Sequence, residues 1–348
     1  MTSGNGASLR VGIAGLGRSG WNIHAKTFQG LSDLYQVVAV ADADAERRSE
    51  AEKTFGCRAY AKFDELIADD EPDLLVVASP NLYHVEHAIA GMRSGKHVVC
   101  EKPFALSASE ADAAIDATLE TGKVLAPFQN RRYEPHFLKV REVIDSGVLG
   151  RVLQIRMSWH GFSRRWDWQT LQEFGGGLLN NNGAHLLDQA LVLFGDHDPE
   201  LFVDLQQALT SGDTEDHVKV ILHAPGAPTI DVELTSASAY PAERWHIMGT
   251  AGGLHGTMDR LDWKWVDWSV MPDRPVDRFP TPDRGYNREE LQWKTGTWTK
   301  PEDFPGEYVM FYRDLYRTLR HGADLYVTPT SVRRQIALLE KCRHACPV

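Results

Sequence analysis

The chain has 348 residues, a formal net charge of −11, and 43% hydrophobic and 24% charged residues. This length exceeds the usual size of one hydrophobic core, so we expect a globular protein of two domains. The negative charge argues against nucleic acid or an anionic membrane surface as a partner. We expect a cytoplasmic protein, because no segment approaches the roughly 20 apolar residues of a membrane span and residues 1–8 contain no signal-peptide core. The four cysteines are also too few and scattered for a disulfide framework.

An apolar run at residues 11–14 ends in a glycine-rich turn, and residues 21–31 are expected to form the helix that follows. The turn has the pattern G-x-G-x-x-G, in which the glycines allow a tight turn, close approach of a pyrophosphate and packing of the helix on the strand. Such a turn can also bind nothing, but the N–H groups and dipole at the helix start favour phosphate. We therefore expect a dinucleotide to contact Gly15, Leu16, Gly17, Arg18, Ser19 and Gly20.

A second strand-like run, residues 36–41, ends at Asp42, which lies 22 residues after Gly20. A carboxylate there can accept hydrogen bonds from the adenosine ribose, whereas the 2′-phosphate of NADP would meet a like charge. The sequence therefore predicts NAD as the cofactor, preferred over NADP. Arg47 and Arg48, in the helix expected at residues 45–55, are the residues that could offset this preference.

The first 126 residues alternate strand and helix signals at short spacing, which predicts a parallel sheet covered on both faces. Further strands are expected at residues 73–78, 96–100 and 124–126, with helices at 81–94, where Asn81 would be the cap, and at 107–121. In such sheets ligands bind beyond the carboxyl ends of the strands. One crevice should therefore collect Gly15, Asp42, Pro80, Lys102 and Gln129.

Lys102 directly follows the expected strand at residues 96–100 and stands between Glu101 and Pro103, at the edge where the nicotinamide should lie. A lysine at a strand end is commonly part of the solvated surface. Here the proline restricts the backbone, and the charged pair follows a strand of buried character. These features favour a functional role for Lys102.

After residue 126 the pattern changes. We expect helices at residues 135–146 and 178–194, separated by a strand at 152–160 and a polar, aromatic loop at 161–176. Consecutive strand-like runs between residues 201 and 270, with no helices between them, predict an antiparallel sheet in an α+β domain. Residues 273–305 should be irregular, and helices near 306–320 and 331–346 should close the chain and pack back on the first domain. The expected domains are 1–126, which binds the dinucleotide, and 127–348, for substrate binding and oligomerisation.

Asn181, His185 and Asp188 stand at positions i, i+4 and i+7 of the helix expected at residues 178–194, so they should share one face. Two interpretations remain open for this polar stripe. His185 is either a buried structural residue whose hydrogen bond goes to Asp188, or a general base or acid.

The loop before this helix and the segment after residue 129 offer candidate substrate contacts. Indole rings suit the apolar face of a sugar ring, and arginines suit an acidic or hydroxyl-rich group, although a tryptophan can also simply pack a loop. The candidates are Arg164, Trp166 and Trp168 in the loop, and Arg131 and Tyr133 after the last strand of the first domain. We predict no metal site, because Cys342, His344 and Cys346 are interpreted as the end of a helix.

These motifs resemble the glucose-fructose oxidoreductase/inositol dehydrogenase (Gfo/Idh/MocA) family. The resemblance implies a Rossmann domain, a second domain with a large open-faced, mostly antiparallel sheet, NAD or NADP, and a sugar, cyclitol or related polyol as substrate. It also implies cofactor contacts from Ser79, Asn81, His84 and Glu101, and catalytic roles for Lys102 and His185. The motifs are the glycine turn with Asp42, Ser79-Pro80-Asn81-x-x-His84, the run from Gly95 to Glu101-Lys102-Pro103, and the run from Gly175-Gly176-Gly177 to Gly183-x-His185-x-x-Asp188. We also expect a homodimer or homotetramer formed through the open sheet face.

One residue departs from the family pattern. Many dehydrogenases of the family carry an aspartate four residues before the histidine, where this chain has Asn181. An amide can orient a hydroxyl but cannot hold a negative charge or take up a proton, so we predict that His185 is less basic here.

The motifs predict a dehydrogenase or reductase that transfers a hydride between nicotinamide and a secondary alcohol or ketone of a sugar-like substrate. Two other classes stay open. One is a redox-neutral hydrolase or lyase, in which tightly bound NAD oxidises a sugar carbon only transiently. The other is a cofactor-sensing regulator without turnover.

Overall fold

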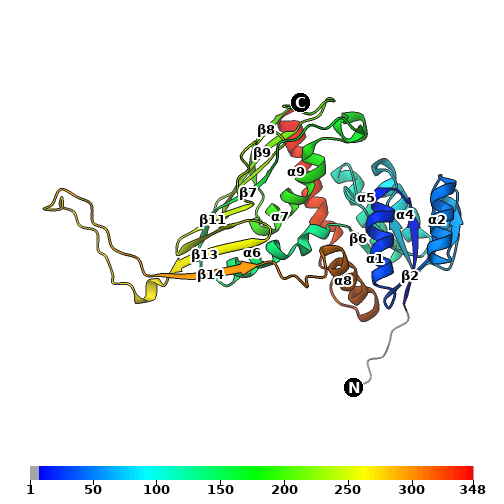
Figure 1. Ribbon diagram of the computed structural model, residues 1–348, viewed down its shortest axis with the longest axis horizontal. Coiled ribbons are helices and arrows are strands. Elements are labelled where there is room, and N and C mark those ends of the chain that lie inside the picture. The colour runs from blue at the N-terminus through cyan, green and yellow to red at the C-terminus, as the bar shows by residue number, and fades with distance from the viewer. Residues whose placement is uncertain (1–7, 348) are drawn as a thin grey trace, which may run out of the picture.

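The computed structural model describes residues 8–347, so residues 1–7 of the polar start lie outside the described part. Two sheets lie side by side, each with its own helices (Figure 1). The fold is an α/β Rossmann domain joined to an α+β domain with a large, mostly antiparallel sheet, as the sequence predicts. In the described residues, no helix combines the length and the apolar character needed to cross a membrane.

The first sheet has the strand order β3-β2-β1-β4-β5-β6, and every neighbouring pair of strands is parallel. Its inner strands are apolar on both faces because helices cover both, as expected for a parallel sheet. The strands are β1 (Leu9–Ala14), β2 (Tyr35–Ala41), β3 (Arg58–Tyr60), β4 (Leu74–Val77), β5 (His97–Cys100) and β6 (Leu125–Pro127). The helices are η1 and α1 (Gly20–Ala25, Lys26–Gly30), α2 (Ala45–Phe55), α3 (Phe63–Ile67), η2 and α4 (Asn81–Tyr83, His84–Arg93) and α5 (Ala108–Thr121).

The prediction that Asn81 caps the helix expected at residues 81–94 is wrong. Pro80 occupies the position before the first helical turn, Asn81 begins a short 3₁₀ turn, and the α-helix starts only at His84. The cap predicted for α5 is present, because the Ser107 hydroxyl accepts a hydrogen bond from the Glu110 N–H at 3.1 Å.

The second sheet has the order β14-β13-β12-β11-β7-β10-β9-β8, and all pairs are antiparallel except β7 with β10. Helices α6, α7 and α9 lie on one of its faces (Figure 1). The strands are β7 (Val152–His160), β8 (Glu200–Gln206), β9 (His217–His223), β10 (Thr229–Thr235), β11 (Trp245–Gly249), β12 (Gly252–Gly256), β13 (Arg260–Val266) and β14 (Trp293–Thr299). The helices are η3 (Asn130–Tyr133), α6 (Pro135–Asp145), η4 (Trp168–Thr170), η5 (Gln172–Phe174), η6 (Leu179–Gly183), α7 (Ala184–Phe194), η7 (Trp268–Val270), α8 (Glu307–His321) and α9 (Pro329–Ala345).

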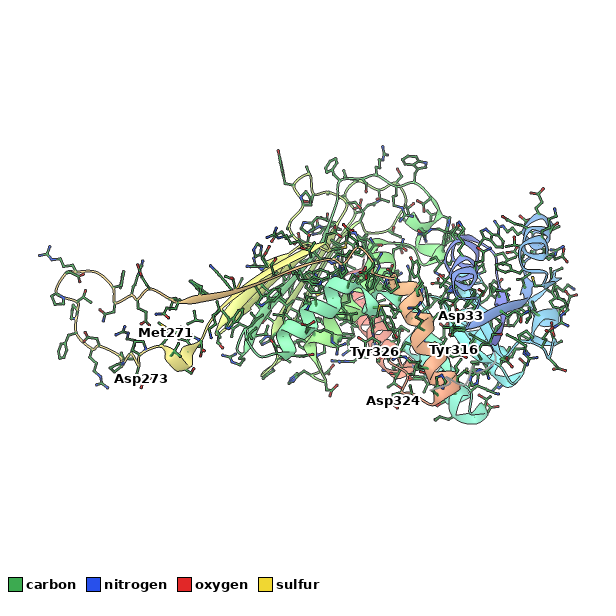
Figure 2. All side chains as sticks on the ribbon, turned by 60° about the horizontal axis from the view of Figure 1, so that its bottom comes forward. Asp33, Met271, Asp273, Tyr316, Asp324 and Tyr326 are labelled. Carbon is green, nitrogen blue, oxygen red and sulfur yellow. The ribbon has the colours of Figure 1, made fainter. Side chains whose placement is uncertain are left out.

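The expectation that residues 273–305 are irregular is wrong for residues 293–299, because Trp293–Thr299 forms the edge strand β14 and pairs with β13. Residues 267–292 form an extended arm that leaves the body between these two strands (Figure 1). Figure 2 places Met271 and Asp273 on this arm, at the opposite end of the molecule from Asp33 of the Rossmann domain. An ion pair of 2.9 Å between Arg274 and Glu289 joins the two halves of the arm.

The two C-terminal helices connect the two cores. Phe311, Tyr312 and Leu315 of α8 are buried in the core of the Rossmann domain. Helix α9 contributes Ile336 to this core and, two residues later, Leu338 to the core under the second sheet. The segment after residue 306 therefore packs against both sheets and limits how far they can move relative to one another.

Candidate functional site

Two adjoining cavities lie between the Rossmann domain and the second domain. The glycine-turn cavity, about 340 Å³, is lined by Gly15 and Gly17, and the histidine cavity, about 530 Å³, is lined by His185. Both volumes fall within the range of roughly 300–1,000 Å³ that is usual for small-molecule sites. The two cavities share a wall formed by Arg18, Ser19, Glu101, Lys102, Trp168, Gln169 and Asn181.

The glycine turn fits the pyrophosphate of a dinucleotide. Gly15 has φ +92°, and a Cβ there would lie 2.5 Å from the Ala78 carbonyl oxygen. A Cβ on Gly20 would collide with the Gly15 carbonyl oxygen, which explains the close packing of helix on strand. Next to Gly17 no atom lies within 4 Å of the position of a Cβ, so its backbone opens into the cavity. A phosphate can therefore approach the N–H groups at the helix start.

Asp42 stands at the end of β2 and holds the glycine turn in place. Its carboxylate accepts hydrogen bonds from the Leu16 N–H at 2.7 Å and from the Asp44 N–H at 2.9 Å. Arg47 comes within 3.6 Å of the same carboxylate and also lines the cavity. The helix turn therefore brings a cation beside the acid, while Arg48 donates to the Asp42 carbonyl oxygen instead.

Ser79, Pro80 and Asn81 line the glycine-turn cavity as expected, but His84 does not. The His84 ring is buried between two carbonyl oxygens, 2.8 Å from that of Ser79 and 2.7 Å from that of Pro103. Burial lowers the pKa of His84 below its ordinary value. His84 therefore ties together the loops that follow β4 and β5, and it lies behind the cavity wall.

Lys102 lies at the junction of the two cavities. Its ammonium group lies 3.3 Å from the Asn181 side-chain oxygen and 3.2 Å from the Asn181 carbonyl oxygen, so it bridges the two domains. Burial lowers the pKa of Lys102, and the adjacent Glu101 carboxylate partly opposes this shift. Glu101 in turn accepts from the Lys102 N–H at 2.9 Å and lies 3.1 Å from His24, whose other ring nitrogen lies 2.7 Å from the Tyr312 hydroxyl. Lys102 is therefore supported by a buried hydrogen-bond network of Glu101, His24 and Tyr312.

A π-helical turn at Leu179–Gly183 carries Asn181 and continues directly into α7. The start of this turn is held by the half-buried Glu215, which accepts a hydrogen bond from the Leu179 N–H at 2.8 Å. A Cβ on Gly177 would collide with the Glu215 carboxylate, so only glycine fits there. Burial raises the pKa of Glu215. A single π-helical turn changes the i, i+4 geometry, and such turns are frequent at functional sites.

His185 follows this turn and lines the histidine cavity, and of the two interpretations left open by the sequence, a hydrogen bond to Asp188 is wrong. Asp188 forms a buried, bidentate ion pair with Arg132, at 2.6 and 2.7 Å. The Nδ1 atom of His185 is buried without a hydrogen-bond partner among the described residues. Burial, reinforced by Lys102 and nearby arginines, holds the pKa of His185 well below its ordinary value. At neutral pH the imidazole is therefore uncharged.

Two of the residues proposed from the loop before this helix do not reach the cavities. The Arg164 guanidinium donates to the Ser211 hydroxyl at 3.0 Å, and the Trp166 side chain is 79% exposed. Neither residue lines a cavity with the glycine turn or His185, whereas Trp168 lines both.

Tyr133 and Gln129 are also placed away from the two cavities. The buried Tyr133 donates its hydroxyl proton to Asp314 at 2.6 Å, and Gln129 donates to the side-chain oxygen of Gln335 at 3.4 Å. Both partners belong to the C-terminal helices, so these two residues bond the segment that follows β6 to α8 and α9. Arg131, by contrast, lines the histidine cavity as expected.

Sequence reasoning missed several lining residues. Arg165, Asp167 and Gln169 point into the histidine cavity, although their neighbours Arg164 and Trp166 were preferred. Strand-like alternation does not separate the two sets, because the 3₁₀ turn at Trp168–Thr170 brings the consecutive residues Trp168 and Gln169 to the same wall. The remaining missed residues are Ile23, Phe128, Asn130, Asn182 and Tyr308, the last from α8.

The fold and the two cavities together define the class of protein, an NAD(P)-dependent oxidoreductase with a Rossmann domain. Residues 9–129 match the family model described as "Oxidoreductase family, NAD-binding Rossmann fold", and residues 137–255 match "GFO/IDH/MocA C-terminal domain". The chain belongs to the Gfo/Idh/MocA family of oxidoreductases.

Several curated relatives are similar over much of their length. The scyllo-inositol 2-dehydrogenase (NADP(+)) IolW of Bacillus subtilis is 27% identical over 96% of this chain and 92% of its own. The myo-inositol 2-dehydrogenase of Thermotoga maritima is 29% identical over 71% of this chain and 74% of its own. The D-glucoside 3-dehydrogenase of Escherichia coli is 33% identical, over 56% of each chain.

Solved structures support the fold. The WlbA dehydrogenase of Bordetella pertussis, in complex with NADH and UDP-GlcNAcA, has a TM-score of 0.78 and is 20% identical, covering 97% of this chain and 96% of that chain. An NAD-binding protein from Listeria innocua also has a TM-score of 0.78, at 25% identity, covering 97% of this chain and 95% of that chain.

Proposed function

We propose that this protein oxidises a secondary alcohol of a sugar, cyclitol or related polyol to a ketone, or catalyses the reverse reduction, with NAD as the preferred cofactor. The observation that carries the proposal is the meeting of the two cavities at Lys102. The glycine turn opens into one cavity, and uncharged His185 lines the other. The inositol and glucoside dehydrogenases among the relatives support the class of substrate.

The bound nicotinamide supplies the two-electron acceptor, and the protein supplies position and proton transfer. In the oxidation, His185 takes the hydroxyl proton of the substrate. Its Nδ1 is buried, so Nε2 is the nitrogen we assign to this step. Lys102 donates a hydrogen bond to the same substrate oxygen and stabilises the negative charge that grows on it. The two residues could exchange these roles.

Other residues that line the histidine cavity hold the substrate. Asn181 keeps Lys102 in place and has an amide group directed to Gln169, 3.2 Å away. Trp168 is 55% exposed at the cavity mouth, where its indole ring can cover the apolar face of a sugar ring. Arg131 lies deeper, over the Trp159 ring.

The proposal is tested by mixing the purified protein with NAD and a panel of polyols and following NADH by absorbance. We expect stoichiometric NADH from at least one polyol. A redox-neutral hydrolase or lyase would instead release product without net NADH. A cofactor-sensing regulator would bind NAD and turn over nothing, and either result would contradict the proposal.

We predict that Lys102→Ala abolishes most turnover while dinucleotide binding is retained. Loss of one group that stabilises transition-state charge lowers the rate by roughly a hundredfold or more. The measurement is kcat, with NADH fluorescence titration as the control for folding and cofactor affinity. A variant that binds NADH normally and keeps most of its activity would remove Lys102 from the mechanism.

We predict that Asn181→Asp shifts the pH profile of oxidation to higher pH. A carboxylate beside Lys102 and the histidine cavity favours the protonated form of His185, so the base loses its proton only at higher pH. kcat/KM should rise with pH as His185 loses its proton. The midpoint of this rise should move upward by about one pH unit if the new carboxylate and the His185 ring lie within about 4–6 Å of each other.

Asn180→Asp is the matched control for this variant. The Asn180 side chain bonds to the Gly175 and Gly176 carbonyl oxygens and to Arg343, away from the Lys102 pair. The same added charge should therefore leave the profile nearly unchanged. An Asn181→Asp profile that superimposes on that of the parent would mean that His185 is not the titrating group or does not sense residue 181.

We predict that Asp42→Ala erodes the preference for NAD over NADP by about tenfold, which corresponds to the loss of one interaction of roughly 1.4 kcal/mol. Arg47→Gln should change the ratio of kcat/KM values in the opposite direction, because Arg47 is the cation placed to meet a 2′-phosphate. Comparable efficiency of the parent enzyme with both cofactors would contradict the preference.

We further propose that residues 1–126 and 127–348 are the two domains, and that the chain forms a homodimer or homotetramer through the open face of the second sheet. In the described residues, α6, α7 and α9 lie on the other face, and Phe202 on β8 is 57% exposed. Light scattering should give a multiple of the 39.0 kDa chain mass.

A cytoplasmic location is supported by four cysteines that are all free thiols.

A further inference from the structure

We propose that the substrate of the histidine cavity carries an acidic group, so that the enzyme acts on a sugar acid or another anionic polyol. This inference rests on the proposed function only in taking the histidine cavity as the substrate site. It names the substrate class more narrowly than the family does.

The walls of the histidine cavity carry more cations than anions. Arg18, Lys102, Arg131 and Arg165 line it, against the carboxylates of Glu101 and Asp167. The whole chain has the opposite balance, a net charge of −11. A local excess of positive charge inside an acidic protein favours entry and binding of an anion.

The carboxylates of the cavity are already engaged with protein groups. Glu101 is buried and bonded to His24 and to the Lys102 N–H. Asp167 accepts two hydrogen bonds from Arg165, at 2.9 and 2.7 Å. Within residues 8–347, in contrast, the acceptors of the Lys102 ammonium are only the two neutral oxygens of Asn181. Its charge is therefore available to a ligand.

The wall behind the cavity adds another cation. Arg244 is almost fully buried, lies over the same Trp159 ring as Arg131, and has two guanidinium nitrogens without hydrogen-bond partners among the described residues. Burial lowers the pKa of Arg244 to about 10, so it still carries its charge at neutral pH. Glu134, which bonds to Arg131, favours the charged form of Arg244 and offsets part of this positive charge.

The cofactor does not account for all of these charges. Arg18 lines both cavities and is placed to meet the pyrophosphate, but Arg131 and Arg165 line only the histidine cavity. The Nε and Nη2 atoms of Arg165 already donate to Asp167, so Nη1 is the nitrogen that Arg165 can offer to an acidic ligand in a charge-assisted hydrogen bond. Arg165 also donates to the side-chain oxygen of Gln169 at 2.7 Å. The acidic group of a ligand could take the place of this neutral acceptor.

The test is a binding measurement with matched pairs that differ only in the acidic group. Isothermal titration compares D-glucuronate with D-glucose, and D-galacturonate with D-galactose, on the full chain saturated with NADH. A charged hydrogen bond to a buried partner is worth roughly 1.5–3 kcal/mol, so each acid should bind at least about tenfold more tightly than its neutral partner.

Arg165→Gln should weaken the binding of the acids much more than the binding of the neutral sugars, and so remove most of this difference. Arg164→Gln is the matched control, because its guanidinium donates to Ser211 outside the cavity. A purely structural effect of residue 165 would weaken acids and neutral sugars alike, and this outcome would overturn the proposal.

Other outcomes are equally decisive. Neutral sugars that bind as tightly as both uronates and as D-glucose 6-phosphate would overturn the inference. If D-glucose 6-phosphate gains affinity and the uronates do not, the anionic class holds and the charge belongs to a phosphate. Acids that bind tightly but yield no NADH with NAD would leave this inference standing and refute the proposed oxidation instead.

Discussion

The contact between the Lys102 ammonium group and Asn181 links the two halves of the molecule at the place where they share a cavity wall. Lys102 comes from the end of a strand in the parallel sheet, and Asn181 from the turn that begins the helix under the second sheet. Each is placed by its own domain. Their approach depends on the C-terminal helices, which pack against both cores. The geometry of the reaction site is therefore a property of the domain arrangement.

Burial has opposite consequences for the two groups at this junction. It lowers the pKa of both Lys102 and His185, but from ordinary values far apart. The imidazole becomes a neutral base, while the amine starts from a value high enough to remain a hydrogen-bond donor. The arginines around the cavity add to the same effect on His185. The positive charge around the cavity therefore favours uncharged His185, and it is the same charge on which we base the proposal of an anionic substrate.

The sequence predicted the Rossmann half well because its signals are local. A strand, a glycine turn, a helix and an acid at the next strand end follow one another within about forty residues, and each has a short-range physical cause. The pairing of Asp188 with Arg132 could not be predicted in this way, because it joins residues 56 positions apart. The π-helical turn is a similar case. It depends on Glu215, which reaches back to Leu179 from a later segment.

Loop directions were equally beyond local reasoning. Arg164 and Arg165 are chemically identical, and only the packed structure decides which one enters the cavity. Strand β14 was not predicted, because the Pro- and Asp-rich arm that precedes it in the sequence separates it from its partner β13.

The most direct measurement of the central claim uses the best polyol substrate, labelled with deuterium at the carbon that is oxidised. If the two cavities meet for hydride transfer, the deuterium is recovered in NADH in proportion to the ketone formed. Product formation with no deuterium in NADH, or with no ketone at all, would show that Lys102 and His185 serve a different reaction.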